Sequence, residues 1–316
     1  MRNFYPLTYT QKSIWNVECT FPNNSINNIA GTIRFKEEFD VALINRAINL
    51  LIKNNEALRI RFLLQNGEPV QYVASYQPYT LDVIDLREEK SYQRFFEIEA
   101  QLTETPFSLF DSDLFYLAYF QLPGESAIYL KFYHLICDAW SVKLIVDTIL
   151  NNYLRLKNGE EINDSLSPSY LDYIETEKKY LNSSQFMKSK DFWNKKVETI
   201  PEFIYLKNKP LHYSIRANRI SFLIPEEISL KIKHYCEERK ISLFTMFVAV
   251  FSIYIHQTTS KNDIMIGTTV LNRLNHIEKN TIGMIVNTIP IRLNIDKSLD
   301  FKSYLSYISS EWKNIL

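Results

Sequence analysis

The sequence predicts a mixed α/β protein, with helices and sheets in layers, folded as two lobes. Its 316 residues exceed the ~100 to 200 residues of one usual domain, and its 46% hydrophobic content is enough for more than one buried core. Both halves mix helical spacing with hairpin-like strands, and the polar run "EEINDSLSP" (160–168) lies between them without periodicity. We therefore expect an N-terminal lobe at 1–165, a helical connector at 166–200 and a C-terminal lobe at 201–316.

The first half opens with a clear helix at 40–55, "DVALINRAINLLIKNN". Asp40 can cap its first turn, and apolar residues at 41, 44, 47 and 51 share one face. Two hairpin signals follow, with the turns "QNGE" and "PGES" between apolar runs. The elements expected after the helix are strands at 58–64, 69–75 and 79–86, a helix at 91–107, strands at 114–122 and 127–136, and a helix at 141–159 that ends at Gly159.

The second half repeats the same mixture of elements. A strongly charged helical stretch at 170–198 leads into it, and "LFTMFVAVFSIYI" (243–255) is apolar all round, too short to span a bilayer and therefore expected as a buried helix. The other expected elements are strands at 218–224, 263–270 and 283–295 and helices at 226–240 and 300–316.

Composition excludes several classes of function. Lys plus Arg and Asp plus Glu both number 36, so no basic surplus favours a nucleic acid or an acidic membrane as partner. The three cysteines are far apart and form no metal-binding or disulfide pattern. Glycine-rich phosphate loops are absent. The N-terminus has no apolar region typical of a secretory signal, and the cysteine pattern favours a reducing cytoplasm. No bound metal or organic cofactor is expected.

The stretch "KFYHLICDAWSV" (131–142) carries the candidate chemistry. His134 lies where a strand ends and a helix is about to begin, and Asp138 follows four residues later. A neutral imidazole can accept a proton near pH 7 and return it, whereas the carboxylate can orient the ring or fix the loop by an ion pair. His-x-x-x-Asp alone is a weak motif, so the other stretches of the chain decide its interpretation.

Five stretches resemble, in order, the signature sequences of the condensation domains of nonribosomal peptide synthetases. They are "YPLTYTQKSIWNVE" (5–18), "NNEALRIRF" (54–62), "YHLICDAWS" (133–141), "IGTTVLNR" (266–273) and "IGMIVNTIPIR" (282–292). The resemblance implies two chloramphenicol acetyltransferase-like lobes that form a V with a tunnel between them. It also implies amide formation between a donor thioester and an aminoacyl acceptor. Both substrates are presented on the phosphopantetheine arms of carrier proteins, with neighbouring synthetase domains as further partners.

The same resemblance assigns roles to individual residues. His134 matches the second histidine of the family's His-His-x-x-x-Asp-Gly motif; it can accept the amine proton or, when protonated, stabilise the oxyanion. Asp138 is expected to meet an arginine, with Arg273 the first candidate and Arg292 the second. The supporting positions are Trp140, whose indole is expected to be buried, Ser141, and Asn287, which either lines the tunnel or ends a strand.

The chain departs from the family pattern in three ways. Tyr133 replaces the first histidine, and Ala139 replaces the glycine, adding a methyl group that could disfavour a positive φ. The chain is also shorter than family members, so we expect a C-terminally truncated domain whose second lobe is incomplete and leaves a sheet edge unpaired.

Three alternatives remain open from sequence. An epimerization domain shares the fold and a similar motif, although "DAWS" has the condensation order. An acyltransferase of the same superfamily could use coenzyme A as its acyl carrier. A non-catalytic module that docks a carrier protein would tolerate Tyr133 and Ala139, but it would not require His134, Asp138 and Arg273.

Overall fold

The computed structural model describes residues 2–162, 167–206 and 220–315. Two compact units emerge from its contacts: Met1–Phe186 with Leu271–Asn287, and Met187–Val270 with Thr288–Leu316. They are called unit 1 and unit 2 below. This division differs from the expected ranges in two respects. The described residues 167–186 of the expected connector belong to unit 1, and unit 1 also takes Leu271–Asn287 from the second half of the chain.

The main sheet of unit 1 has the strand order β2-β7-β6-β5. These strands are β2 (Asn28–Phe35), β7 (Glu125–Tyr133), β6 (Phe115–Leu122) and β5 (Asp82–Asp85). The expected hairpin at 114–136 is confirmed, with Leu122 paired to Glu125 and Gly124 at a φ of 71° in the turn. β5 runs parallel to β6. β2 pairs with β7 along its whole length and was not predicted, because "NIAGTIRF" alternates only weakly.

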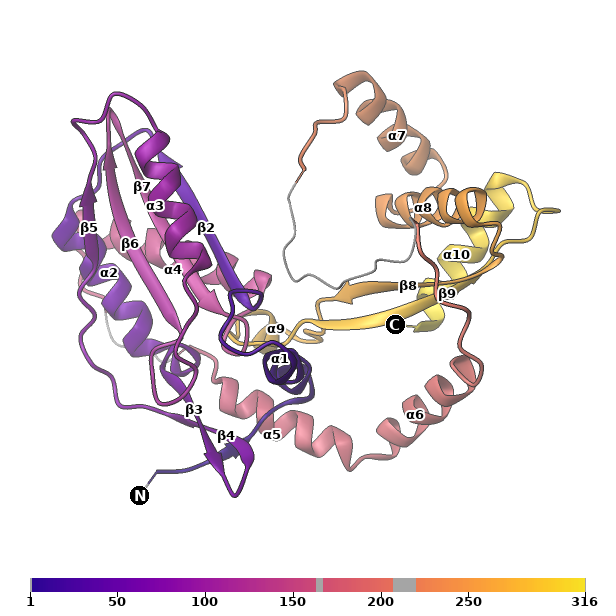
Figure 1. Ribbon diagram of the computed structural model, residues 1–316, viewed down its shortest axis with the longest axis horizontal. Coiled ribbons are helices and arrows are strands. Elements are labelled where there is room, and N and C mark those ends of the chain that lie inside the picture. The colour runs from indigo at the N-terminus through magenta and orange to yellow at the C-terminus, as the bar shows by residue number, and fades with distance from the viewer. Residues whose placement is uncertain (1, 163–166, 207–219, 316) are drawn as a thin grey trace. The chain divides into compact units, whose positions relative to one another are not determined.

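Helices cover both faces of this sheet, as the labelled ribbons of Figure 1 show within unit 1. Leu117, Tyr119 and Leu130 pack in one cluster with α2 (Val41–Asn54) and α4 (Ala139–Lys157). Alternate residues of the same strands, such as Ala118 and Phe120, pack with Phe95 of α3 (Gln93–Glu104) in another. The period of two along each strand therefore builds a helix–sheet–helix sandwich.

The remaining elements of unit 1 surround the start of the chain. A small sheet, β1-β4-β3, contains the second expected hairpin, whose turn residues Asn66 and Gly67 have φ values of 53° and 84°. Its strands are β1 (Tyr5–Pro6), β4 (Glu68–Val73) and β3 (Ile60–Gln65). The other pieces are α1 (Tyr9–Thr20), which was not predicted, η1 (Glu56–Arg59), α5 (Tyr170–Leu181) and α9 (His276–Lys279).

Unit 2 is smaller and is built around α8 (Leu243–Thr259). Val248 and Ala249 pack with Ile291 of β9 (Asn287–Asn294) and with Tyr304 and Leu305 of α10 (Phe301–Ile315). β8 (Asp263–Val270) and β9 form a two-stranded sheet, in which each strand has only the other as a neighbour among the described residues. The other helices are α6 (Ser184–Lys196), which begins in unit 1, and α7 (Glu226–Glu238).

Three expectations for the second half need correction. The charged stretch 170–198 forms two helices, because α5 ends at Leu181 and α6 begins at Ser184. Residues 220–224 of the expected strand at 218–224 form no strand, and 218–219 lie outside the described residues. The strand expected at 283–295 begins only at Asn287, because the N–H groups of Ile285 and Val286 donate to a side chain instead of to a neighbouring strand.

The helix at 243–255 is present but only half-buried. Ala249 and Ser252 are fully covered, whereas a stripe of apolar side chains on α8 is 42% to 52% exposed, namely Leu243, Phe247, Val250, Phe251 and Tyr254. No described helix is by itself long and apolar enough to cross a membrane. α7 and α8 reach that length and composition only as a pair bent by 109°.

We expect Gly283→Ala to destabilise unit 1. Gly283 has a φ of 155°, and an added Cβ would lie 2.1 Å from a ring carbon of Tyr170, a fully buried residue that cannot move aside. Such overpacking costs about 1–3 kcal/mol. Urea unfolding measures the loss. Gly31→Ala is the matched control, because no atom lies within 4 Å of its added Cβ; equal losses for the two variants would contradict the prediction.

Candidate active site

The site begins where β7 ends. The main chain leaves the sheet at Tyr133, and the residues that follow are held by two hydrogen bonds. The N–H of His134 donates to the carbonyl of Asn27 at 2.9 Å. The side-chain amide of Gln11 donates to the carbonyl of Leu135, also at 2.9 Å. α4 then starts at Ala139. His134 is therefore presented by a short, fixed loop between a strand and a helix.

Asp138 is the organising residue of this loop. As the N-cap of α4 it accepts the N–H of Ser141 at 2.8 Å, and it also accepts the N–H groups of Ile285 and Val286 at 3.0 and 2.9 Å. The Arg273 guanidinium donates to both carboxylate oxygens, at 2.8 and 3.1 Å. Five donors thus occupy one carboxylate, which leaves it no capacity to act as a base.

Arg273 lies in the segment that returns to unit 1 after β8. Its side chain is fully buried and also donates to the hydroxyl of Ser141 at 3.1 Å and to the carbonyl of Thr281 at 3.3 Å. Ser141 in turn donates to the carbonyl of Gly283 and accepts its N–H, at 2.9 and 3.0 Å. The start of α4 and residues 281–286 are therefore joined into one hydrogen-bonded block.

Electrostatics explain the charge state of this pair. Burial by itself raises the pKa of Asp138, but the Arg273 guanidinium and the N–H groups of Val286 and Ser141 outweigh it, so the pKa lies below its ordinary value of 3.8. Asp138 is consequently ionised at neutral pH, and the buried positive charge of Arg273 is compensated.

The His134 ring is partly buried in the same loop. Burial lowers its pKa below 6.5, against the opposing effects of its own carbonyl, the Asp138 charge and the carbonyl of Cys137. Its Nδ1 is buried and has no well-aligned hydrogen-bond partner among the described residues. At neutral pH the imidazole is therefore neutral and able to accept a proton.

The other residues that the sequence assigned to the site lie in different places in the structure. Arg292, the second candidate for Asp138, lies in unit 2 and pairs with Asp263 at 2.6 Å. Trp140 is half-buried rather than buried, because its indole N–H reaches outward to the carbonyl of Lys279 at 2.8 Å. Ala139 is the exposed first residue of α4, and its φ is not positive, so its methyl group causes no strain there. Asn287 is the exposed first residue of β9.

Several residues that hold the site were not assigned to it from sequence. Thr10 and Tyr170 both donate to the carbonyl of Met284 at 2.9 Å, and the N–H groups of Ile285 and Val286 bind Asp138. The stretches "YTQ" and "IGMIV" carried a family signal, but main-chain donors have no signature in the side-chain sequence. Among the described residues, no group of three or more His, Cys, Asp or Glu side chains could hold a metal ion.

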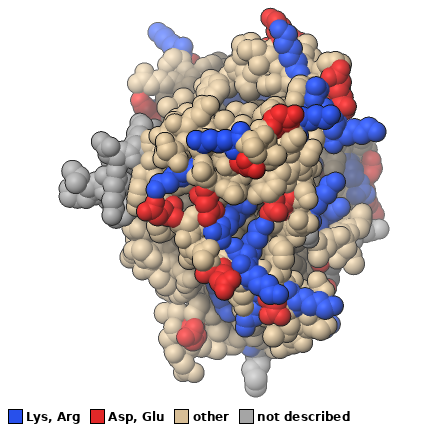
Figure 2. Space-filling view, turned by 90° about the vertical axis from the view of Figure 1, so that its right-hand side faces the viewer, with Lys and Arg blue, Asp and Glu red and all other residues tan. Residues whose placement is uncertain are grey.

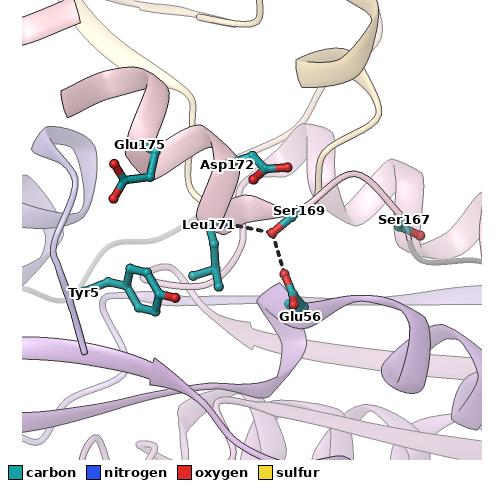
Figure 3. A pocket seen from close by; sticks show the side chains of 7 residues that line it. All are labelled: Tyr5, Glu56, Ser167, Ser169, Leu171, Asp172 and Glu175. Carbon is teal, nitrogen blue, oxygen red and sulfur yellow. Dashed lines mark hydrogen bonds between the residues drawn. The ribbon is translucent and has the colours of Figure 1, made fainter. Parts of the chain in front are cut away.

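A surface pocket of unit 1 lies apart from these residues. It has a volume of about 380 Å³ and three carboxylates in its lining (Figure 3). Ser169, the N-cap of α5, donates to Glu56 there and accepts the N–H of Leu171 at 3.1 Å. None of His134, Asp138 or Arg273 lines this pocket.

On the face of the molecule in Figure 2, acidic side chains interrupt the basic ones, in keeping with the equal totals of the two charges.

Comparisons with known proteins agree with this fold. Residues 1–315 match the family model of the condensation domain. Surfactin synthase subunit 1 of Bacillus subtilis (strain 168) is 35% identical over 308 residues, which are 96% of this chain and 9% of that protein. The chain therefore spans less than a tenth of the length of this curated relative. It belongs to the condensation domain family of nonribosomal peptide synthetases.

Solved structures show the same fold. The first condensation domain of the CDA synthetase superposes with a TM-score of 0.89 at 20% identity, covering all of this chain and 74% of that one. A variant of the starter condensation domain of rhizomide synthetase, in complex with C8-CoA, superposes with a TM-score of 0.84 at 20% identity, covering 99% of this chain and 72% of that one. The expected mixed α/β fold and the resemblance to condensation domains are thus confirmed.

We expect Asp138→Asn to lower the free energy of unfolding by about 3–5 kcal/mol at pH 7, because Arg273 would remain buried without a counter-charge. The folded-state pKa of Asp138 is depressed, so its contribution is present above pH 3.8 and is lost as the pH falls through the folded-state value. Urea unfolding at pH 7 and near pH 3 should therefore show a difference that shrinks in acid. Asp263→Asn is the control: its pair with Arg292 is partly exposed, with 44% of the Asp263 and 22% of the Arg292 side chain accessible, and should contribute about 1 kcal/mol or less.

The pKa of His134 predicts a second pH effect. Because burial lowers it, the unfolded chain binds more protons just below pH 6.5, and stability falls as the pH drops through that range. The slope is at most about 1.4 kcal/mol per pH unit for one proton. Unfolding measured between pH 7 and 5 should show this loss in the wild type and not in His134→Gln. Identical slopes for the two proteins would show that His134 is not desolvated.

Proposed function

We propose that this chain catalyses amide formation between a donor acyl or peptidyl thioester and an aminoacyl acceptor, both carried on phosphopantetheine arms of carrier proteins. The observation that carries the proposal is the neutral His134 on a loop locked by Asp138 and Arg273, in a chain that matches the condensation family over residues 1–315. Donor and acceptor carrier proteins and neighbouring synthetase domains are the proposed partners, and the cytoplasm is the proposed location.

The proposed reaction forms one bond and breaks one. The acceptor amine attacks the thioester carbonyl carbon, the resulting tetrahedral intermediate expels the sulfur, and the proton lost by nitrogen ends on the departing thiolate. The lowered pKa of His134 favours the role of proton acceptor over that of a permanently protonated oxyanion donor. Holding two tethered substrates together is itself worth roughly 7–11 kcal/mol of the barrier.

Asp138 and Arg273 are proposed as positioning residues. The five donors around the carboxylate and the complete burial of the guanidinium leave neither group open to a substrate. Their proposed function is to fix the direction in which the main chain leaves His134.

A second donor is supported by one comparison. A variant of the starter condensation domain of rhizomide synthetase was solved in complex with C8-CoA, so a domain of this fold can hold a coenzyme A derivative. We propose acyl-coenzyme A as the alternative donor, with the same amine attack and the coenzyme A thiol as leaving group.

We expect His134→Ala to slow single-turnover amide formation by about 10²- to 10⁴-fold, the usual contribution of a general base. The assay presents the acceptor on its carrier protein and the donor either on a carrier protein or as acyl-coenzyme A, which distinguishes the two donors. His234→Ala is the matched control, since that side chain is 73% exposed on α7. Carrier binding without product from either donor would favour the non-catalytic docking module.

A further inference from the structure

A hydrogen-bonded bridge connects Tyr133 to two residues from the start of the chain. The Tyr133 hydroxyl donates to Glu18 of α1 at 2.6 Å. It also accepts the side-chain amide of Asn27, just before β2, at 3.1 Å. A phenylalanine at this position could make neither bond, so the bridge depends on the tyrosine hydroxyl.

Two of the three bridge residues are buried, and Glu18 is partly buried. Tyr133 is 2% exposed and Asn27 4% exposed, and the rings of Tyr133 and Phe107 pack edge to face with centroids 6.1 Å apart. Burial, followed by the bond to Glu18, raises the pKa of the Tyr133 hydroxyl, which therefore remains a hydrogen-bond donor throughout the physiological range. A buried hydroxyl and amide that satisfy each other fix one arrangement, because any other leaves an unpaired polar group.

Asn27 joins this bridge to the main chain at His134. Its side chain binds the Tyr133 hydroxyl, and its carbonyl accepts the N–H of His134 at 2.9 Å. The second carboxylate oxygen of Glu18 accepts the N–H of Asn23, whose φ of 56° marks a tight turn, at 3.0 Å. The loop between α1 and β2 is thereby held at two points: Glu18 binds it at Asn23, and Tyr133 binds it at Asn27.

We propose that Tyr133, Asn27 and Glu18 are positioning residues that set the place of the His134 imidazole through the main chain. The proposal rests on the proposed function in one respect only: the imidazole so placed is the one that acts in amide formation. None of the three residues is proposed to touch a substrate. This chain thus carries a tyrosine-based support at the position where the family motif has a histidine.

The test compares variants that break the bridge with one that breaks an equivalent pair of bonds elsewhere. Tyr133→Phe and Glu18→Ala remove the bridge, whereas Glu18→Gln keeps an acceptor for the hydroxyl. The control is Tyr119→Phe in β6, whose buried hydroxyl also makes two bonds, to the N–H and carbonyl of Phe39 at 2.9 and 3.4 Å. Thermal unfolding of every variant accounts for any loss of folded protein.

Two readouts separate positioning from mere stability. In the free protein, the NMR signals of the His134 ring and its titration should shift in Tyr133→Phe and Glu18→Ala, and stay unchanged in Tyr119→Phe and nearly so in Glu18→Gln. In the amide-forming assay, the two bridge-breaking variants should lose about 10- to 100-fold in kcat, with KM nearly constant. The double variant should lose no more than the worse single one, because both remove the same support.

Two results would overturn the proposal: an unmoved His134 ring in Tyr133→Phe, or equal losses of kcat in Tyr133→Phe and Tyr119→Phe. If the wild type forms no amide with either donor, the proposed function fails while the NMR comparison still decides whether the bridge positions His134.

Discussion

The buried ion pair between Asp138 and Arg273 is the interaction on which the site depends. A carboxylate without exposure to water is tolerated only when its oxygens are fully bonded, and here a guanidinium and three main-chain N–H groups supply those bonds. Because Ile285 and Val286 are among the donors, the pair draws residues 271–287 into unit 1, although most of their sequence neighbours belong to unit 2. The strand that would have begun at Gly283 starts at Asn287 for the same reason.

The His134 side chain is not part of the hydrogen-bonded network around Asp138, but that network fixes the loop that carries it. Its ring makes no bond to Asp138; the carboxylate instead caps α4 and so fixes where the loop after β7 ends. The loop is held before His134 by Asn27 and after it by Gln11. A ring held by its main chain, with a lowered pKa that leaves it neutral at pH 7, is suited to accepting a proton from a bound substrate.

The fold accommodates Ala139 and Tyr133, the two residues that depart from the family motif. Ala139 begins a helix, where a methyl group is favourable, and its side chain is exposed. Tyr133 is buried with its hydroxyl fully used by Glu18 and Asn27. Neither replacement takes part in the Asp138 network, since Ala139 is exposed and the Tyr133 hydroxyl binds Glu18 and Asn27. These accommodations weigh against a site that has lost its support.

The sequence by itself determined the strongly periodic elements, both hairpins of unit 1, the helix capped by Asp40, and the place of His134 and Asp138 between a strand and a helix, because these follow from local spacing and turn chemistry. It also pointed to Arg273 through a resemblance to a family. It did not reveal β2, α1 or the break at Leu181, where local propensity is weak, nor the half-exposed face of α8. Only the tertiary structure decided which arginine meets Asp138, which main-chain N–H groups complete it, and how Tyr133 is held. Apart from the N–H of Ser141, which is three residues from Asp138, these contacts join residues more than 100 positions apart, so only the folded chain brings them together.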